Sequence, residues 1–529
     1  MTGSAIKLEG KQLLIMDTTL RDGEQTTGVS FSENEKLSVS KILLEDIGVD
    51  RIEIASARVS EGEFTGTKRV MQWAAKKKGF LGKIEVLGFI DGKVSLEWIQ
   101  KAGGKVINLL CKGSFKHVTQ QLRKTPEEHV ADIKQVIAYA NEMGIKVNIY
   151  LEDWSNGMRN SKDYVHFMVS ELKGQEIDRI MLPDTLGILD PDETYDYCKE
   201  MIESFPDVNF DFHAHNDYDL AIANVFHAIK AGINCVHTTI NGLGERAGNA
   251  PLSSVIATVK DHLKMKTNVN ESNLNRASKL VETFSGIRIP TNKPLIGEYV
   301  FTQCSGIHAD GDSKNNLYFN ELLPERFGRI RKYALGKTSG KANIRKNLEE
   351  LGIELDAESL KRVTDKIIVL ADQKETVTNE DLPYIVADVL NSQFIEQKIK
   401  VINYSMTHAK GLKPVASVAI EIAGKRYSEF SEGDGQYNAF MKALRKIYRK
   451  LGKPFPKLID YVVTIPPGGR TDALVETVIT WKNEHEFKTR GLDPDQTTAA
   501  INATVRMLNI LETNFKPGFI GKIMDNLKV

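Results

Sequence analysis

Acidic and imidazole side chains stand directly after apolar, β-rich runs in the N-terminal half of the chain. Asp22 follows the run LLIMDTTL with Arg21 beside it, and the run NFDFHAHN carries His213 and His215 at its end. Residues two apart on a strand project to the same side, so both imidazoles face one way. Two nitrogen ligands and one carboxylate suit a divalent metal that keeps positions open for substrate. Ligand chemistry leaves Zn²⁺, Mn²⁺ and Mg²⁺ open, and the structural alternative is a pair of ordinary core histidines.

Further polar side chains follow other runs of the same kind. Glu152 and Asp153 end the run KVNIYLED, and Asp184 and Thr185 end the run RIMLPDT. All of them fall at predicted carboxyl ends of strands, which is the face on which barrel active sites are built. A structural scatter of polar residues would favour neither end, so the distribution predicts an active site at this face.

Two segments rich in glycine add candidate residues. The loop NGLGERAGNAPL allows backbone amides to approach a ligand, and its Asn249 offers an amide oxygen to the metal, although a tight barrel turn explains the glycines equally well. Further on, CSGIHADG contains His308, and LYFNELLPERFG contains Tyr318. A surface position is the alternative interpretation of His308.

The elements that must position these residues alternate between short strands and amphipathic helices. From residue 13 to about 263 there are eight strand and helix pairs, which is the size and order of a (β/α)₈ TIM barrel. An open doubly wound sheet is the competing fold, but no GxGxxG turn follows the first strand. We therefore expect an α/β fold with a catalytic barrel over residues 10–284.

The remainder of the chain predicts two more regions. Residues 285–394 are punctuated by Pro and Gly and then show short helical patterns, which indicates a linker with a small helical subdomain. Residues 395–520 return to period two and repeat one order, three strands and then a helix, twice. This pattern predicts a C-terminal α+β domain of two βββα units, with a regulatory role or a dimerisation role alone.

Composition excludes several classes of protein. The 529 residues carry 70 Lys and Arg against 70 Asp and Glu, so the chain has no overall basic field for nucleic acid. No apolar run approaches the length that spans a bilayer, and the N-terminus lacks a signal-peptide core. Four scattered cysteines form neither a CxxC pair nor a disulfide framework, so we expect a cytoplasmic protein with no membrane and no nucleic-acid partner.

Ordered motifs connect the chain to a known family. DTTLRDGEQ, YLEDWSNG, LPDTLG, FHAHND and NGLGERAGNAPL resemble the motifs of the α-isopropylmalate, homocitrate and citramalate synthase family, a branch of the TIM-barrel metallolyases. The similarity continues through GIHADG into the C-terminal domain. It implies a Claisen condensation of acetyl-CoA, as co-substrate, with a 2-oxo acid at a divalent metal. It also implies a homodimer with a domain-swapped active site.

The resemblance assigns a role to each residue that matches a family motif. Asp22, His213 and His215 become metal ligands, with Asn249 as a fourth candidate. The remaining roles are polarisation of the reacting carbonyl by Arg21, binding of the substrate carboxylate by Thr185, acid–base catalysis by Glu152, and delivery of His308 and Tyr318 from the second subunit.

Three positions match the pocket that selects the 2-oxo acid in this family. Leu87, Leu110 and Tyr150 are bulky, so they leave room for the methyl group of pyruvate and exclude the isopropyl group of 2-oxoisovalerate. The strings EVLGFIDG and INLLCKGS also resemble bacterial (R)-citramalate synthases more than isopropylmalate synthases. We therefore expect (R)-citramalate synthesis for isoleucine, with 2-isopropylmalate synthesis for leucine as the alternative. The leucines could also be barrel filling without bearing on the substrate.

The C-terminal strings EGDGQYNAF, PKLIDYVVTIPPGG and DPDQT resemble the effector region of the same family. The resemblance implies end-product feedback by an amino acid, with isoleucine favoured and leucine as the alternative. The matching positions are Tyr437, Leu458, Tyr461, Ile465, Pro494 and Gln496.

Two further functions compete with a synthase. A metal-dependent lyase or aldolase would share the barrel fold and the use of a bound metal ion, but the duplicated C-terminal domain argues against it. A catalytically dead barrel kept as an amino-acid sensor is the other, and the intact Arg21, Asp22 and Glu152 argue against that.

Overall fold

A computed structural model describes residues 8–312, 314, 316–350, 353–372, 377, 381–389, 398–464, 475–483 and 486–512. The chain forms two compact units, of which the first is Met1–Phe301 with Phe319–Arg331 and the second is Thr302–Tyr318 with Lys332–Val529. The predicted boundary at residues 394 and 395, and the predicted end at residue 520, lie outside the described residues.

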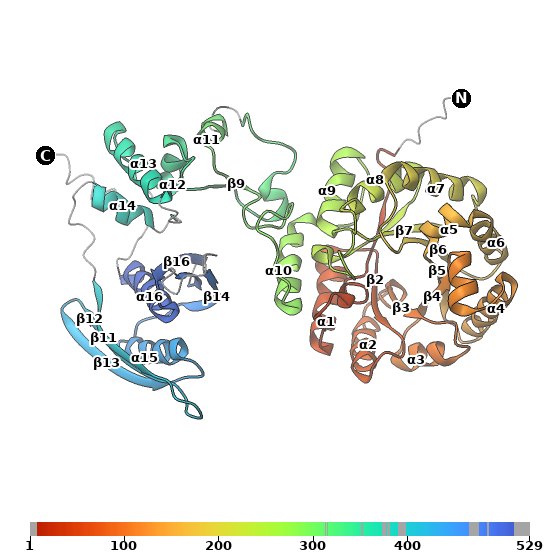
Figure 1. The fold of residues 1–529 in the computed structure, drawn as a ribbon, viewed down its shortest axis with the longest axis horizontal. Coiled ribbons are helices and arrows are strands. Elements are labelled where there is room, and N and C mark those ends of the chain that lie inside the picture. Colours follow the sequence, from red (N-terminus) through yellow and green to blue (C-terminus); the bar gives the residue numbers. More distant parts are fainter. Residues whose placement is uncertain are drawn as a thin grey trace. The chain divides into compact units, whose positions relative to one another are not determined.

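The first unit is built on eight parallel strands that close into a barrel in sequence order (Figure 1). Closure comes from the pairing of the first strand with the last, in which Leu14 lies opposite Cys235. The predicted TIM barrel is thereby confirmed and the open doubly wound sheet is excluded. The strands are β1 (Leu14–Asp17), β2 (Arg51–Ser56), β3 (Ile84–Gly88), β4 (Val106–Lys112), β5 (Lys146–Glu152), β6 (Arg179–Asp184), β7 (Phe210–Ala214) and β8 (Cys235–Thr238).

Helices surround the strands on the outside of the barrel (Figure 1). Their apolar sides and the outward-facing strand residues share one buried core, which is the usual source of stability for this fold. The helices are α1 (Glu33–Lys41), α2 (Glu61–Ala74), α3 (Val94–Ala102), α4 (Pro126–Glu142), α5 (Trp154–Asn160), α6 (Lys162–Leu172), α7 (Pro191–Ser204), α8 (Ala221–Ala231), α9 (Leu252–His262) and α10 (Leu274–Ser285).

The starts of three barrel helices are determined by local sequence. In a capping box the first side chain accepts a hydrogen bond from a backbone N–H three residues later, and the Glu there reaches back. These boxes begin α1, α4 and α7, and their pairs are Ser32 with Glu35, Thr125 with Glu128, and Asp190 with Glu193. The capping box predicted at Thr125 is therefore present.

The second unit contains a helical part and an α+β part, as predicted. The helical part has its own apolar core, and the α+β part has another. The helical part consists of β9 (Thr302–Gln303), α11 (Gly306–Asp312), β10 (Lys332–Tyr333), α12 (Lys341–Glu350), α13 (Ala357–Asp372) and α14 (Leu382–Val389).

The α+β part repeats three antiparallel strands and a helix, which confirms the two predicted βββα units. In the first of them, α15 lies along the sheet of β11, β12 and β13 (Figure 1). The first βββα unit consists of β11 (Ile399–Thr407), β12 (Val415–Ile422), β13 (Lys425–Glu432) and α15 (Gln436–Lys450). The second is β14 (Lys457–Thr464), β15 (Val475–Lys482), β16 (Glu486–Asp493) and α16 (Gln496–Glu512).

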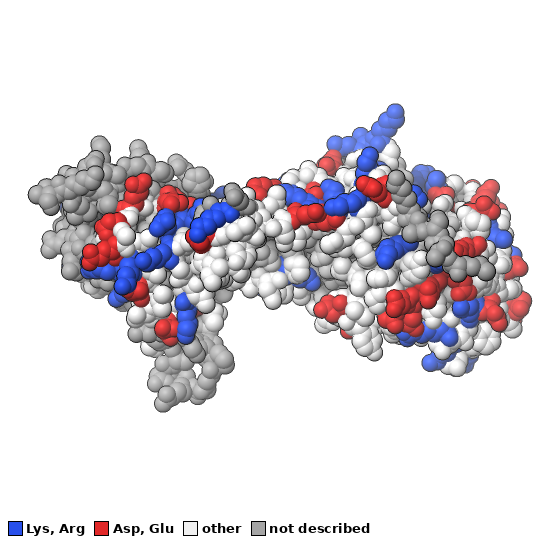
Figure 2. Space-filling view, turned by 90° about the horizontal axis from the view of Figure 1, so that it is seen from above, with Lys and Arg blue, Asp and Glu red and all other residues white. Residues whose placement is uncertain are grey.

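Among the described residues, no helix combines the length and the apolar character needed to cross a membrane. Acidic and basic side chains are interspersed on the face of the molecule drawn in Figure 2. This mixture accords with the zero net charge of the sequence.

Candidate active site

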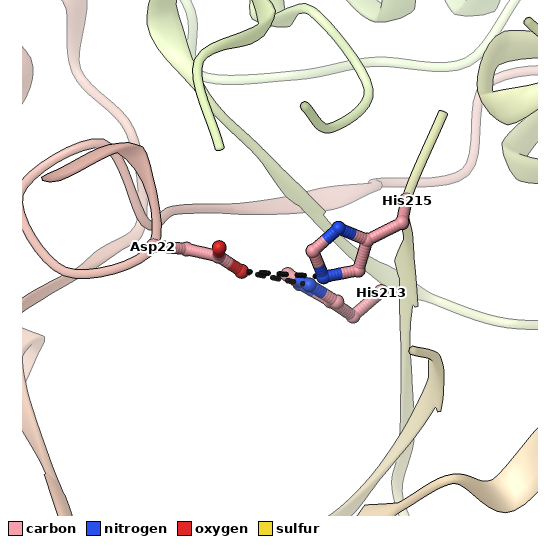
Figure 3. A group of neighbouring side chains, drawn as sticks. All are labelled: Asp22, His213 and His215. Carbon is pink, nitrogen blue, oxygen red and sulfur yellow. Dashed lines mark ion pairs between the residues drawn. The ribbon is translucent and has the colours of Figure 1, made fainter. Parts of the chain in front are cut away.

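Three ligand-type side chains converge at the carboxyl end of the barrel strands. Asp22 Oδ2 lies 3.1 Å from His213 Nε2 and 3.7 Å from His215 Nε2. Figure 3 shows the carboxylate and the two imidazoles pointing toward one another from opposite sides. All three residues are buried, and one ligand atom from each lies within 4.8 Å of the others. This is a group that can hold a divalent metal ion.

Barrel topology explains the convergence of residues so far apart in sequence. His213 lies on β7 and His215 directly follows that strand, so the period of two turns both rings to the same side. Asp22 is held in the turn after β1 by a hydrogen bond from its backbone N–H to Thr18 O, at 2.8 Å. Strand β8 pairs with both β1 and β7, which brings the two strand ends together.

The protonation states favour metal binding. Burial lowers the pKa of His215 to about 4, against the opposing effect of Asp22, and burial also lowers the pKa of His213. Burial by itself raises the pKa of Asp22, but the charge of Arg21 and the bond from His213 outweigh it and hold that pKa well below its usual range. The group is therefore a carboxylate with two neutral imidazoles at neutral pH, and these are the forms that bind metal ions.

Unpartnered oxygen atoms mark the same place. Among the described residues, Asp22 Oδ1 and Asn249 Oδ1 are buried without a hydrogen-bond partner. Asn249 forms a backbone bridge with His215, while its Nδ2 donates to Leu243 O at 3.1 Å. A buried oxygen that accepts no hydrogen bond is costly unless something else satisfies it. Asn249 Oδ1 is therefore available as a further ligand.

The glycines of this loop permit a tight turn. Gly248 has a φ of +85°, and a Cβ there would lie 2.0 Å from Gly242 O. A Cβ at Gly244 would lie 2.1 Å from Asn249 Nδ2. A side chain at Gly244 would displace the Asn249 amide, and one at Gly248 would clash with the backbone of Gly242, so the turn requires both glycines.

Arg21 is anchored beside the metal group by several neighbours. Its Nε donates to Glu53 Oε2 at 2.5 Å, and its Nη1 lies 3.4 Å from Asp22 Oδ2. Its Nη2 donates to the hydroxyl of Tyr150 at 3.5 Å. A guanidinium has five N–H donors, so two remain without a protein acceptor among the described residues. Those two donors are free for a substrate oxygen.

The three positions predicted to select the substrate lie in one cluster inside the barrel. Leu87 and Tyr150 are buried with Met16, Met181 and Cys235, and Leu110 packs against the cluster while half-buried. Tyr150 is more than an apolar wall, however, because its hydroxyl also lies 3.0 Å from His237 Nδ1.

Sequence reasoning missed Glu53 and His237, which lie within β2 and β8. A signal was present, since strands of a parallel sheet usually read as continuous apolar runs and these two are interrupted by a charged and an imidazole side chain.

The other strand-end residues divide into two groups. Glu152 forms an ion pair with Lys112, the residue opposite it in the pairing of β4 and β5, and Glu152 remains half-buried. Asp184 instead accepts from the backbone N–H groups of Ile188 and Leu189, both at 3.0 Å. Glu152 is thus held at the barrel mouth by a side-chain partner, whereas Asp184 holds the turn after β6.

Asp153 and Thr185 contact each other at the same barrel face. The backbone N–H of Asp153 donates to Thr185 Oγ1 at 2.9 Å, and Asp153 Oδ2 accepts from Ser114 Oγ at 2.7 Å. Thr185 Oγ1 donates to no acceptor among the residues that the structure describes, so its hydroxyl proton is available to a ligand.

Comparison with family models covers most of the chain. A model described as HMGL-like matches residues 12–281, which is more than half of the sequence. The chain belongs to the HMGL-like family. A model described as homocitrate synthase post-HMGL domain-like matches residues 295–375, and the LeuA allosteric (dimerisation) domain matches residues 376–512.

Individual relatives of this HMGL-like chain fall into two activities. It is 32% identical over 501 residues to the (R)-citramalate synthase of Methanocaldococcus jannaschii, covering 94% of this chain and 99% of the relative. It is 33% identical over 507 residues to the 2-isopropylmalate synthase of the same organism, covering 94% of each. Identity therefore does not separate the two substrates.

Two residues with predicted catalytic roles lie in the second unit of this HMGL-like chain. His308 is on α11, and its ring centroid lies 4.3 Å from that of Tyr318. Both side chains are exposed, Tyr318 to 43%. The structure brings these two together as a pair, and their role in catalysis stays a prediction.

Residues predicted to bind an effector lie in the LeuA domain. Tyr437 of α15 has its ring 5.5 Å from that of Tyr461 on β14, and its hydroxyl lies 2.7 Å from Thr504 Oγ1 of α16. These contacts join the two βββα units. Leu458 packs against the same core, Pro494 and Gln496 are exposed, and Ile465 lies outside the described residues.

Proposed function

We propose that this chain condenses acetyl-CoA with a 2-oxo acid, and that pyruvate is the preferred acid, giving (R)-citramalate and CoA. The observation that carries the proposal is the convergence of Asp22, His213 and His215 beside an Arg21 with two free donors. Relatives that match the chain over nearly its whole length are named as synthases of this type.

We assign the metal group to Asp22, His213 and His215, with Asn249 as the fourth ligand. The unpartnered oxygens of Asp22 and Asn249 fit this assignment, as do the neutral imidazoles. Zn²⁺, Mn²⁺ and Mg²⁺ all suit two nitrogens and two oxygens. When bound, the ion supplies Lewis-acid polarisation of the keto group and a template that fixes the face of the 2-oxo acid.

The chain's own residues supply the remaining steps. The Thr185 hydroxyl donates to the carboxylate of the 2-oxo acid, and the free N–H groups of Arg21 donate to the keto oxygen as negative charge develops there. Glu152, together with His308, takes a proton from the methyl group of acetyl-CoA. The resulting carbanion carbon bonds to the keto carbon, the π bond of the keto group breaks, and the alkoxide takes up a proton. Water then cleaves the thioester, which gives a carboxylate and releases CoA.

Pyruvate is favoured by the cluster of Leu87, Leu110 and Tyr150. These bulky side chains pack together inside the barrel, and their bulk disfavours a branched substituent. A few methylene groups provide discrimination of about 1 to 3 kcal/mol in such a pocket. The second candidate is 2-isopropylmalate synthesis from 2-oxoisovalerate, because the chain is equally similar to a relative of that name.

The LeuA domain supports two further parts of the proposal. One is a homodimer in which His308 and Tyr318 of one subunit complete the site of the other. The second is feedback inhibition by an amino acid held near Tyr437 and Tyr461, with isoleucine favoured over leucine. Inhibition requires that the amino acid bind one of two states of the enzyme better than the other.

The experiment that tests the proposal is a CoA-release assay with acetyl-CoA and either pyruvate or 2-oxoisovalerate, after saturation with each metal in turn. We expect faster release with pyruvate, inhibition by isoleucine and no release after chelation. A preference for 2-oxoisovalerate with inhibition by leucine would establish the second candidate instead. Absence of CoA release with both acids would reject a synthase and restore the lyase hypothesis.

A further inference from the structure

A closed circuit of polar side chains runs through the interior of the barrel, where apolar filling is usual. It starts at Arg21, passes through strands β2 to β8 and returns to Arg21. Each neighbouring pair lies between 2.5 and 3.5 Å apart. In order, the members are Arg21, Glu53, Asn108, Asn148, Arg179, Glu85, Arg51, Asp211, His237 and Tyr150.

With a neutral His237, the last part of this circuit has one direction of donation. Arg21 can only donate, so the oxygen of Tyr150 accepts from it at 3.5 Å. At the other end, Asp211 carries a carboxylate whose Oδ2 already accepts from Arg51 Nη2 at 2.6 Å. That carboxylate lies 3.3 Å from His237 Nε2 and can only accept from it. With a neutral ring, His237 then carries its proton on Nε2 and presents a lone pair on Nδ1.

The hydroxyl of Tyr150 completes the sequence. It lies 3.0 Å from His237 Nδ1 and donates its proton there, because Nδ1 has none to give. A phenol is protonated at neutral pH, so this group is a hydroxyl with one proton to donate. As a result the oxygen turns its lone pairs toward Arg21 and has no proton left for a substrate.

We propose that His237 is a positioning residue, which orients the Tyr150 hydroxyl as an acceptor and thereby holds Arg21 in place against the keto oxygen. The inference rests on the proposed function, since it concerns Arg21 acting in that reaction. Glu53 holds the Nε side of Arg21, and the pair of Tyr150 and His237 holds the Nη2 side. Because both sides of the guanidinium are held, the two remaining N–H groups of Arg21 point in fixed directions.

Stability is a weak explanation for the circuit. Buried ion pairs such as Arg51 with Glu85 and Asp211 are expensive to desolvate, and apolar residues of similar volume are often as stable. Unlike apolar filling, the polar circuit fixes the orientation of Arg21, which it contacts on both the Nε side and the Nη2 side. Precise orientation of a donor matters most where charge develops during a reaction.

The test is a double-mutant cycle on the metal-loaded enzyme. His237→Leu removes the acceptor, Tyr150→Phe removes the hydroxyl, and each is expected to lower kcat about tenfold, the low end for a hydrogen bond to a charged group. The KM for pyruvate should change less than kcat, because the contact of Arg21 strengthens in the transition state. If His237 acts through Tyr150, the double variant loses no more than either single variant.

His237→Gln is the rescue control, because its amide offers both an acceptor for Tyr150 and a donor for Asp211. We expect it to retain most of the wild-type kcat. His227→Leu, on α8 outside the circuit, should have no effect. The inference would be overturned if the fold-losses of kcat in the two single variants multiplied in the double variant. It would also be overturned by a Tyr150→Phe variant with normal kcat.

A measurement on the wild type makes the inference independent of how the variants fold. In ¹⁵N-histidine-labelled protein loaded with diamagnetic Mg²⁺, the His237 signals are those lost in His237→Gln. Their shifts should show the Nε2-protonated tautomer, and an Nδ1-protonated ring would contradict the direction of donation. A wild type that releases no CoA would instead reject the proposed function, while the tautomer would still test the circuit.

Discussion

Replacement of Lys36 tests how the barrel holds the two segments that carry Arg21 and Glu53. Its side chain is 1% exposed, and its Nζ lies 2.6 Å from Glu24 Oε2 and 2.5 Å from Glu63 Oε1. The same Nζ donates to the backbone oxygens of Leu20 and Ile54, at 3.2 and 3.0 Å. Leu20 precedes Arg21 and Ile54 follows Glu53, so this ammonium joins the segments that carry the anchored arginine.

Replacement of Lys36 with Met keeps most of the volume but removes the charge. Two largely buried carboxylates and two carbonyl oxygens then lose their donor. Breaking a buried pair by removing one partner costs about 3 to 5 kcal/mol. For a unit of this size that corresponds to a decrease in Tm of roughly 5 to 8 °C.

The effect should depend on pH. Burial raises the pKa of Glu63, while the charge of Lys36 lowers it, so the variant raises that pKa further. An acid whose folded pKa is raised destabilises the fold when it is ionised, so the penalty appears as pH rises above the unfolded value of about 4.3. We expect the deficit of the variant to be full near pH 7 and to shrink toward pH 4, where the raised pKa leaves the Glu63 carboxyl group neutral.

The assay is urea unfolding followed by tryptophan fluorescence, at a fixed metal concentration. In a Trp481→Phe background the remaining tryptophans, Trp73, Trp98 and Trp154, all lie in the barrel unit. The matched control is Lys41→Met, an exposed lysine on the same helix, for which a change below about 0.5 kcal/mol is expected. A deficit below 1 kcal/mol at pH 7, or one that does not vary with pH, would refute the reasoning.

Three shorter predictions concern the proposed reaction. His213→Ala should lose bound divalent metal in equilibrium dialysis, whereas His227→Ala on α8 should retain it; equal metal content would remove His213 from the ligand set. Leu110→Ala should raise kcat/KM for 2-oxoisovalerate relative to pyruvate at least tenfold, because it deletes three carbons of the pocket wall; an unchanged ratio would make Leu110 barrel filling. Glu152→Ala and His308→Ala should each be nearly inactive alone and regain part of the activity in mixed dimers, and a lack of recovery would argue against delivery of His308 in trans.

Much of the fold could be predicted from the sequence because its determinants are local. Alternation of apolar strands with capped helices specified the barrel, and a capping box such as Thr125 with Glu128 needs only neighbours along the chain. The return to period two after residue 395 likewise predicted the two βββα units. The predicted metal group also followed from position, since parallel strands gather their carboxyl ends at one face.

Tertiary structure alone decided what surrounds those residues. His237 and Tyr150 are 87 positions apart, and Arg21 and Glu53 are 32 apart, so no local pattern predicts that they bond. Lys36 reads as an ordinary surface lysine of an amphipathic helix, yet barrel closure buries its ammonium among four acceptors. Sequence determined which residues stand at the carboxyl ends of strands, because the order of strand and turn residues is a local property. Only the closed barrel determined how they are held, because burial and hydrogen-bond direction depend on strands that meet across it.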